Sequence, residues 1–557
     1  MPTVDFTRYY RYAEMTEALQ AFVEAYPTLA QLESIGKSHE GRDIWCITIT
    51  NTATGPADEK PAYWLDGNLH ASENTGCMGA LHVIQTALNG YGNRPDVTRL
   101  LDTSTLYIVP CVNPDGMEQV LSSPYTLRSG TRPYPYADEE DGLYPYDIDG
   151  DGMVLEMRVK DPDGPWKVHE KDPRLMVRRK PDEYGGTYYR IFTEGLIRNY
   201  DGEIVKVARP LQGLDFNRNF PYSWAPEGEE QGAGPYTLSE PETHALVKFV
   251  SEHPNISGSI SYHTYSGAIL RPYSDRPDDD MPIDDLWTYQ EIGARGQELT
   301  GYPHISVFHD FRYHPRKVMH GSFDGWAYEN QGIFAFVVEL WDMIAEAGIK
   351  DRDFIGWMRN HPVEDDLKLL QWNDEHLNGE GFVNWRPFQH PQLGEVEIGG
   401  WIDQYTMNNP PHKFLLKCLE PNTEFVLAHA SMLPRLELRK LVAEQISEGV
   451  YRVQATLANG GYLPTYTSRR ALAIKAVRPI IVSLDLPEGA SLVSGELKQE
   501  IGHIEGRANN DSLWTRSVSV NNLRKLEWVV RAPAGSTINL TAVAQRAGTV
   551  RGSVVAE

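Results

Sequence analysis

Apolar residues follow two different spacings along the first 350 residues of the chain. Near the N-terminus they recur at the period of a helix that stops before Pro27. Its apolar positions are Met15, Leu19, Phe22, Val23 and Tyr26. Compact apolar runs of strand length follow at 62–67, 105–112, 256–263 and 333–340. Residues 78–88 again have helical spacing, and Ser239–Glu242 has the pattern of a capping box. This alternation predicts an α/β fold with a mixed or mostly parallel central sheet flanked by helices.

The pattern changes after about residue 430. Seven short apolar segments, one of them ALAIKAV at 471–477, follow one another with Gly, Pro and Asn between them. They predict an all-β sandwich domain at 431–557, behind a larger domain at 1–430. Two earlier stretches, 130–210 and 378–412, show little periodicity. We interpret the first as a long insertion, because a loop of that length in a compact domain is usually functional or separately organised.

Charge and cysteine content exclude several classes of protein. The formal net charge of −25 argues against nucleic-acid binding, because phosphate neutralisation needs clustered Lys and Arg. The chain lacks a run of 18 apolar residues, so we expect no membrane-spanning segment. Four cysteines without CxxC spacing predict buried thiols. No signal peptide is visible, so we expect the protein in the cytoplasm. If a leader is missing from this sequence, we expect it to be secreted or periplasmic.

Residues with metal-binding chemistry follow the ends of the predicted strands. His70 and Glu73 are three apart, and in a helical turn this spacing places imidazole and carboxylate on one side. A catalytic zinc takes three N or O ligands from the protein and leaves a position for water. His263 is a candidate third ligand, because open α/β sheets place ligands at the carboxyl ends of their strands. Each of these residues, taken alone, would more often be structural.

Glu339 is a candidate general base. It lies inside an apolar run, where an unpaired carboxylate is costly to bury. Pairing with an arginine is the alternative explanation for this residue.

Five short motifs occur in the order found in zinc metallocarboxypeptidases of the pancreatic, M14 type. They are His70-Ala-Ser-Glu73, Asn113-Pro-Asp-Gly116, Asp215-Phe-Asn-Arg-Asn219, His263-Thr-Tyr-Ser266 and Val338-Glu339-Leu340. Residues 322–342 also resemble the segment that leads to the catalytic glutamate of this family. The chain therefore resembles this carboxypeptidase family over roughly residues 8–345, as a bacterial-looking member with a long insertion and a C-terminal β-domain.

The resemblance implies a role for each matching residue. His70, Glu73 and His263 would bind one zinc ion per chain. Glu339 would take a proton from zinc-bound water, whose pKa the metal lowers towards about 7. Asp215 would orient His70. Asn217 and Arg218 would hold the C-terminal carboxylate of the substrate, and Arg128 would stabilise the oxyanion. Arg132 is a rival for the last role, because the insertion that follows makes the alignment uncertain.

Three features depart from the family pattern. Ser72 stands where the family often has arginine, and the insertion is longer than in the digestive enzymes. The mobile tyrosine of the family has no exact counterpart; Tyr313 is the nearest candidate, although Arg316 or Lys317 sits nearer the expected place.

Substrate preference is open from the sequence. Phe323 at the floor of the side-chain pocket would suit an apolar C-terminal residue of the substrate. Asp324, if it points inward, would suit a basic residue, and Arg271 would suit an acidic one. We expect a neutral or apolar residue.

A second metal-binding pattern lies within the insertion. Asp147, Asp149, Asp151 and Gly152 have the spacing of an EF-hand-like calcium loop. Position 12 is Arg158 where glutamate is expected, and Glu156 would have to substitute in another loop geometry. A calcium site and a solvated acidic turn are both consistent with this sequence.

The expected function is hydrolysis of the last peptide bond of a peptide with a free C-terminal carboxylate, by zinc-activated water. Two alternatives stay open. One is a peptidoglycan-stem or γ-glutamyl peptidase, or an amidase, on the same scaffold. The other is a catalytically silent zinc-binding module.

Overall fold

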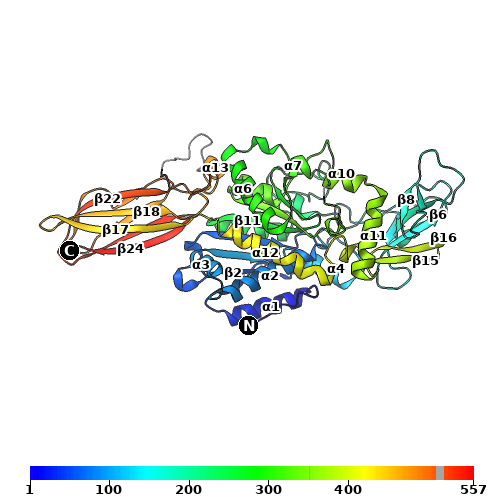
Figure 1. Ribbon diagram of the computed structural model, residues 1–557, viewed down its shortest axis with the longest axis horizontal. Coiled ribbons are helices and arrows are strands. Elements are labelled where there is room, and N and C mark those ends of the chain that lie inside the picture. Colours follow the sequence, from blue (N-terminus) through cyan, green and yellow to red (C-terminus); the bar gives the residue numbers. More distant parts are fainter. Residues whose placement is uncertain (351, 510–519) are drawn as a thin grey trace.

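An eight-stranded mixed sheet forms the centre of the molecule in the computed structural model, which describes residues 1–350, 352–509 and 520–557 (Figure 1). Its strands lie in the order β1-β2-β4-β3-β11-β14-β12-β13. The inner pairs β4–β3, β3–β11 and β11–β14 are parallel, whereas β1–β2, β2–β4 and β14–β12 are antiparallel. The strands are β1 (Ala30–Lys37), β2 (Asp43–Ile49), β3 (Ala62–Gly67), β4 (Thr105–Val109), β11 (Ile256–Thr264), β12 (Ala268–Arg271), β13 (His304–Ser306) and β14 (Phe334–Leu340). The predicted mixed sheet and its four apolar strands are confirmed.

Helices cover both faces of this sheet and bury two separate apolar cores. One face packs against α1 (Tyr12–Ala25), α2 (Asn74–Gly90), α3 (Pro95–Thr103), α6 (Ile283–Thr300) and α12 (Leu415–Ala430). The opposite face packs against α5 (Pro241–Glu252) and α8 (Phe323–Gln331). The shorter or peripheral helices are α4 (Pro114–Ser122), α7 (Val307–Asp310), α9 (Met343–Glu346), α10 (Phe354–Arg359) and α11 (Val363–Leu377). Both helices predicted from apolar spacing, at the N-terminus and at 78–88, are present.

The capping box predicted at the start of α5 is not formed. The helix is capped at Glu240, one residue later than expected, and Pro241 takes the first helical position, where its missing N–H costs nothing. Ser239 donates its hydroxyl to the Glu240 side chain, and Glu242 accepts the backbone N–H of His39. The expected reciprocal bonds are therefore replaced by contacts with other segments.

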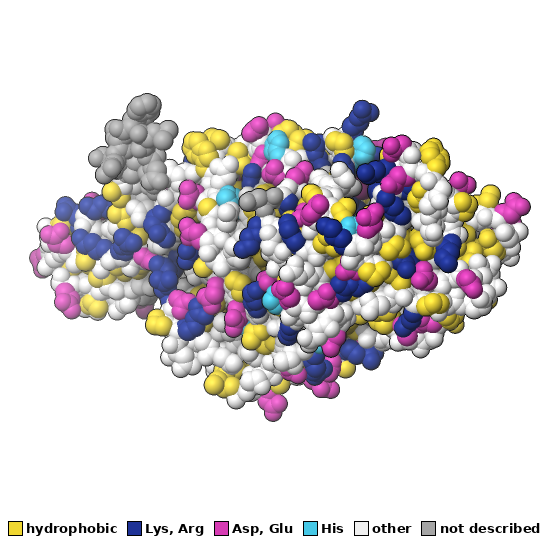
Figure 2. Space-filling model, turned by 45° about the vertical axis from the view of Figure 1, so that its right-hand side comes forward, with side chains coloured by type: hydrophobic (Ala, Val, Ile, Leu, Met, Phe, Trp, Pro, Cys, Tyr) yellow, Lys and Arg dark blue, Asp and Glu magenta, His cyan; other side chains and the backbone are white. Residues whose placement is uncertain are grey.

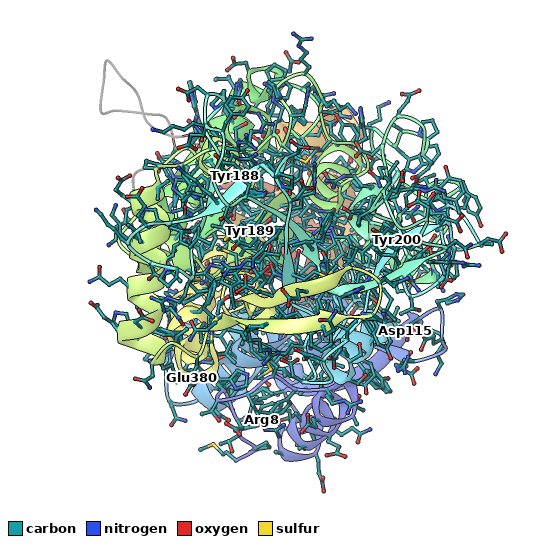
Figure 3. The ribbon with its side chains drawn as sticks, turned by 90° about the vertical axis from the view of Figure 1, so that its right-hand side faces the viewer. Arg8, Asp115, Tyr188, Tyr189, Tyr200 and Glu380 are labelled. Carbon is teal, nitrogen blue, oxygen red and sulfur yellow. The ribbon has the colours of Figure 1, made fainter. Side chains whose placement is uncertain are left out.

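The two stretches without periodicity fold together into a second sheet, which we call the insertion sheet. Its strand order is β15-β16-β6-β9-β7-β8, so residues 156–193 pair with residues 382–401. The strands are β6 (Glu156–Lys160), β7 (Trp166–Val168), β8 (Met176–Arg178), β9 (Tyr189–Thr193), β15 (Phe382–His390) and β16 (Gly394–Trp401). A two-stranded ribbon of β5 (Gly142–Pro145) and β10 (Gly195–Arg198) lies beside it and shares its apolar cluster. Figure 3 views the molecule from this end, where Tyr188 and Tyr189 mark the start of β9.

The C-terminal part forms two four-stranded antiparallel sheets around one apolar core. They lie at the opposite end of the molecule from the insertion sheet (Figure 1). Their strands are β17 (Leu436–Ser447), β18 (Val450–Asn459), β19 (Ile481–Asp485), β20 (Ser491–Ser494), β21 (Lys498–Glu500), β22 (Leu523–Arg531), β23 (Thr537–Ala544) and β24 (Gly548–Val555). The strand predicted at 471–477 is wrong: it overlaps the short helix α13 (Arg469–Ala473), which Ser468 caps. The division of the chain near residue 430 remains a prediction.

Many charged side chains lie on the surface (Figure 2), whereas the cysteines lie in the core as predicted. Side chains of both signs are interspersed over the face shown in Figure 2. The four cysteines are free and buried. Among the described residues, the helices include none that is both long enough and apolar enough to span a bilayer.

Candidate functional site

The ends of three neighbouring strands bring the predicted metal ligands together. His70 and Glu73 follow β3, with Glu73 at the N-cap of α2. His263 lies near the end of β11, the strand that pairs in parallel with β3. Glu339, on β14, is the direct neighbour of His263 in the register of those strands. All four side chains are buried.

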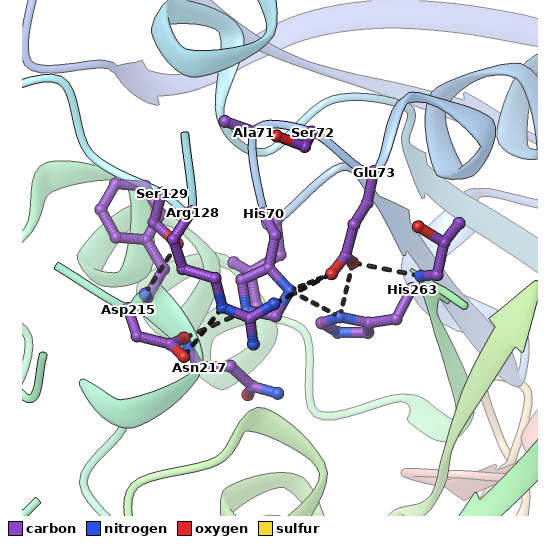
Figure 4. Close-up of polar contacts among 12 residues, drawn as sticks. His70, Ala71, Ser72, Glu73, Arg128, Ser129, Asp215, Asn217 and His263 are labelled. Carbon is purple, nitrogen blue, oxygen red and sulfur yellow. Dashed lines mark hydrogen bonds and ion pairs between the residues drawn. The ribbon is translucent and has the colours of Figure 1, made fainter. Parts of the chain in front are cut away.

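Three possible ligand atoms converge in this group (Figure 4). His70 Nδ1 lies 2.8 Å from Glu73 Oε1 and 3.0 Å from His263 Nδ1. His263 Nδ1 is also 3.0 Å from Glu73 Oε2. The backbone N–H of Thr264 donates to the same oxygen at 3.2 Å, which fixes the carboxylate. One nitrogen from each imidazole and one carboxylate are therefore close enough to share a metal ion.

Each ring also has a polar partner on its far side. His70 Nε2 faces Asp215 Oδ1 at 3.0 Å, so this ring can keep a proton on Nε2 while Nδ1 is free to bind a metal ion. His263 Nε2 faces Ser261 Oγ at 3.3 Å. With protons on these far nitrogens, two lone pairs and a carboxylate would point at one another, which is electrostatically unfavourable without a cation between them. Two nitrogen donors and one oxygen donor from buried side chains are a ligand set that suits zinc.

Arg128 and Asp215 form the polar surroundings of His70. Arg128 donates from Nη1 to Glu73 Oε1 at 3.1 Å and from Nε to Asp215 Oδ2 at 3.0 Å. Asp215 also accepts the backbone N–H of Asn217. Burial alone would raise the pKa of Asp215, but Arg128, Arg218 and His70 outweigh burial and hold this pKa well below its usual range. Asp215 is therefore held as the ionised partner of His70.

Glu339 is a buried carboxyl group in a different electrostatic state. Burial raises its pKa well above the usual range, the nearby Glu73 carboxylate adds to this effect, and Arg128 opposes it. A carboxyl group with a strong affinity for a proton suits a general base.

A cavity of about 390 Å³ opens beside these residues. Its polar lining includes Asn217, Arg218 and Tyr313. Arg218 is 8% exposed, and its Nε contacts Glu230 Oε1 at 3.2 Å. Asn217 Oδ1 accepts the backbone N–H of Phe323 at 2.9 Å. Tyr313 stands exposed at the rim, and Arg359 donates to its carbonyl oxygen. These predicted substrate-binding residues therefore surround the same cavity as the metal ligands.

Several rival candidates lie elsewhere. Arg132 pairs with Glu240, and Arg271 pairs with Asp278. Arg316 and Lys317 are exposed and lie outside the residues that line the cavity.

Asp324, and not Phe323, lines the cavity. Phe323 packs in the core against Phe220 and Trp326. Asp324 is 2% exposed, and its Oδ2 has no hydrogen-bond partner among the described residues. The cavity wall around it is largely apolar and is supplied by Leu270, Val307, Phe311, Met319, Val337 and Phe354.

The acidic loop of the insertion is folded as a compact turn. Oxygens of Asp147, Asp149 and Asp151 lie within 4.8 Å of one another. Asp147 accepts the backbone N–H of Gly150 at 2.7 Å. Arg386, from β15, contacts both Asp149 and Asp151. Arg158, at position 12 of the expected loop, pairs instead with Glu397 on β16.

The sequence reasoning missed two buried polar residues behind His263. Asp66 on β3 and Ser261 on β11 are register partners, and the Ser261 hydroxyl donates to Asp66 at 2.6 Å. A signal for Asp66 was available: it lies in the apolar run AYWLDG, as Glu339 lies in FVVEL. A carboxylate in such a run has to be paired or functional.

Comparisons with known proteins assign the family. Residues 15–147 and 155–350, more than half of the chain, match the family model described as zinc carboxypeptidase. Residues 435–555 match a model described as "Domain of unknown function (DUF8731)".

Individual relatives are distant. A zinc carboxypeptidase of Saccharothrix mutabilis subsp. capreolus is 33% identical over 113 residues, which are 20% of this chain and 26% of the relative. Carboxypeptidase B of Astacus astacus is 23% identical over 349 residues, 61% of this chain and 88% of the relative. The crystal structure of carboxypeptidase A from Helicoverpa armigera superposes with a TM-score of 0.41 at 18% identity, over 67% of this chain and 74% of that one. The alignments with the Saccharothrix enzyme and with mouse carboxypeptidase M span only about a quarter of those relatives. Because this family model matches more than half of the chain, including His70, Glu73, His263 and Glu339, the chain belongs to the zinc carboxypeptidase family.

Proposed function

We propose that the protein removes the C-terminal residue of peptides by hydrolysis, with one zinc ion per chain. The observation that carries this proposal is the convergence of His70 Nδ1, His263 Nδ1 and the Glu73 carboxylate beside Glu339. His70, Glu73 and His263 would hold the ion. Bound zinc would supply Lewis-acid chemistry, lowering the pKa of a water molecule and polarising the scissile carbonyl.

The side chains around this centre would perform the remaining steps. Glu339 would accept a proton from the attacking water and pass it to the nitrogen of the leaving residue. Arg128, fixed by Glu73 and Asp215, would stabilise the negative charge that develops on the carbonyl oxygen.

Recognition of the substrate terminus would fall to Asn217 and Arg218. Arg218 lies at the cavity wall and is anchored there by Glu230. A planar guanidinium suits the two oxygens of a terminal carboxylate. This geometry favours exopeptidase action over cleavage within a chain.

Zinc content and cleavage of blocked dipeptides by wild type and Glu339→Gln test the proposal. We expect about one zinc per chain in both proteins, and release of the C-terminal residue only by wild type. Zinc binding without cleavage of free-carboxylate peptides would favour the amidase, the peptidoglycan-stem or γ-glutamyl peptidase, or the silent module. If wild type binds no zinc, the proposal is wrong.

We further propose that the cavity prefers a long basic C-terminal side chain, although the sequence alone favoured a neutral or apolar one. Apolar walls suit the aliphatic stem of lysine or arginine, and Asp324 offers an unpaired oxygen to the cationic end. Burial raises the pKa of Asp324, so Asp324 is neutral at low pH and its attraction for a cation grows as pH rises.

The preference is measured as kcat/KM for a dipeptide ending in Lys divided by kcat/KM for a dipeptide ending in Leu. We expect the ratio to exceed one, to rise with pH, and to fall at least tenfold in Asp324→Asn. Asp280→Asn, a change on the exposed side of the same domain, is the control and should leave the ratio unchanged. A ratio that favours Leu in wild type at every pH would exclude the basic preference.

We also propose calcium binding by the loop of Asp147, Asp149 and Asp151. The guanidinium of Arg386 forms ion pairs with two of these carboxylates, so calcium would have to displace it. Calorimetric titration with Ca²⁺ should therefore show tighter binding to Arg386→Ala than to wild type. Absence of binding to both proteins at millimolar Ca²⁺ would establish the acidic turn instead.

A further inference from the structure

A chain of hydrogen bonds runs from the core to the back of His263. Trp64 Nε1 donates to Asp66 Oδ2 at 2.6 Å, and Ser261 Oγ donates to Asp66 Oδ1 at 2.6 Å. Ser261 Oγ also lies 3.3 Å from His263 Nε2. The four side chains are at most 2% exposed. Water therefore has little access to this chain.

The direction of each bond follows from the chemistry of the groups. An indole N–H can only donate and an ionised carboxylate can only accept, so both oxygens of ionised Asp66 are used as acceptors. Burial raises the pKa of Asp66 to about 7, so the relay has this direction above that pH. The Ser261 hydroxyl has only one hydrogen, and it is given to Asp66. The Ser261 oxygen then offers a lone pair to His263, which favours a proton on Nε2 of that ring. The Glu73 carboxylate, 3.0 Å from Nδ1, favours the opposite tautomer, so the contact with Ser261 competes with it and leaves Nδ1 available to a metal ion.

We propose that Asp66 is a positioning residue that acts through Ser261 to fix the tautomer of His263 with Nδ1 free for zinc. The inference rests on the proposed zinc site. The arrangement differs from that of His70, whose far nitrogen contacts the carboxylate of Asp215 directly. A serine relay makes the tautomer of His263 depend on which way one hydroxyl points.

Replacement of Asp66 by asparagine should reverse that hydroxyl. The Trp64 N–H still needs an acceptor, which holds the amide oxygen on its side and turns the amide NH₂ towards Ser261. Ser261 has two side-chain partners among the described residues, Asp66 and His263. Since the amide NH₂ cannot accept its hydrogen, Ser261 would donate to His263 Nε2 and force the proton of the ring onto Nδ1. That nitrogen could bind zinc only after losing the proton.

Zinc affinity, measured by competition with a chelator on the full chain, tests the proposal. Asp66→Asn should bind zinc about 10–100-fold more weakly than wild type, as expected when the partner of a metal-binding histidine is lost. Ser261→Ala should have the smaller effect, although Ser261 is the nearer residue, because no hydroxyl then opposes the required tautomer. The double variant Asp66→Asn with Ser261→Ala should recover most of the affinity lost in Asp66→Asn.

The double variant separates the proposed role from a structural one. Damage to packing would accumulate, so a double variant weaker than both single variants would overturn the proposal. Unchanged affinity in Asp66→Asn would overturn it too. Zinc binding by wild type remains the test of the proposed function itself: if wild type lacks zinc that function fails, whereas equal binding by wild type and Asp66→Asn removes only the role of Asp66.

A direct measurement covers the case in which Asp66→Asn does not fold. Nitrogen chemical shifts of labelled histidines in the full wild-type chain, stripped of metal, report the tautomer of each neutral ring. His263→Gln identifies the signal of His263. The share of His263 rings with the proton on Nε2 should be larger in wild type than in Ser261→Ala, and an equal share in the two proteins would overturn the proposal.

Discussion

Arg128 and Arg132 are only four residues apart, yet their guanidinium groups have different surroundings. Arg128 contacts Glu73 and Asp215 at the edge of the cavity. Arg132 pairs with Glu240, which is 1% exposed and lies at the start of α5. The first is placed to act on a substrate and the second to neutralise a buried carboxylate.

Alanine substitution at each position should therefore have different consequences for activity. Arg128→Ala should lower kcat by about 10²–10³-fold, the usual cost of losing an oxyanion donor. It should also lower stability, because Glu73 and Asp215 lose a partner. Arg132→Ala should keep kcat within about twofold but lower stability by on the order of 2 kcal/mol, because Glu240 loses its partner. Steady-state kinetics and thermal melts measure both effects. A large loss of kcat in Arg132→Ala alone would exchange the two roles.

Residues in the candidate site were predictable where their position depends on strand order alone. His70, His263 and Glu339 follow or end apolar runs, so an α/β fold brings them to one edge of the sheet. The choice between Phe323 and Asp324 depends on the phase of α8, which a sequence without clear amphipathic spacing does not fix. The contact of Asp66 with Ser261 depends on the register between β3 and β11, which becomes known only from the structure.

At the scale of elements, α5 begins with an unusual buried acid. Glu242 is 1% exposed; one carboxylate oxygen accepts the N–H of His39, and the other has no hydrogen-bond partner among the described residues. Burial raises the pKa of Glu242 to about 7, and Asp115 and Glu240 contribute in the same direction. The folded protein therefore binds this proton more tightly than the unfolded chain does.

The stability contributed by this proton should disappear as pH rises. It is present below the ordinary pKa of glutamate and is lost as pH increases through about 7, because the unfolded chain releases the proton first. Glu242→Gln keeps an acceptor for His39 and removes the titration. Urea unfolding at pH 5 and pH 8 measures the free energy of unfolding that each protein loses as pH rises. This loss should be smaller in Glu242→Gln than in wild type, by at most on the order of 3 kcal/mol.

An exposed glutamate of the same helix provides the control. Glu252→Gln, at the last residue of α5, should stay within about 0.5 kcal/mol of wild type at both pH values. If Glu242→Gln loses as much stability as wild type between pH 5 and pH 8, Glu242 is not the group that titrates.

The insertion sheet shows why some elements were not predictable. Its strands β7 and β8 have only three residues each, too few for an alternating pattern to be recognised. Strand β6 pairs with β16, more than 230 residues away along the chain, as the bond of Arg158 to Glu397 illustrates. The prediction of a strand at 471–477 was wrong for a related reason. An apolar run this short fits a strand or a helix equally well, and its contacts in the folded protein decide between them.

At the scale of the whole molecule, the C-terminal region is joined to the central sheet by buried polar contacts. Arg546, 1% exposed, donates to the carbonyl oxygen of Gly332, and so does the hydroxyl of Ser468. Asp285 on α6 accepts the backbone N–H groups of Arg469 at 2.7 Å and Arg470 at 2.9 Å. The first turn of α13 is thus held by a carboxylate from the other side of the proposed division at residue 430.

This junction should make the two regions unfold together. Asp285→Ala would leave three donors without their acceptor, namely the N–H groups of Arg469 and Arg470 and the hydroxyl of Tyr328. We expect a loss of stability on the order of 3 kcal/mol and, in calorimetry, the replacement of one transition by two.

The neighbouring Asp284→Ala is the matched control: it removes only a partly exposed ion pair with Arg469, for a cost below about 1 kcal/mol. If the two variants melt alike in a single transition, the junction does not depend on Asp285. If wild type already melts in two transitions, residues 431–557 unfold independently, and the junction at Asp285 does not couple the two regions.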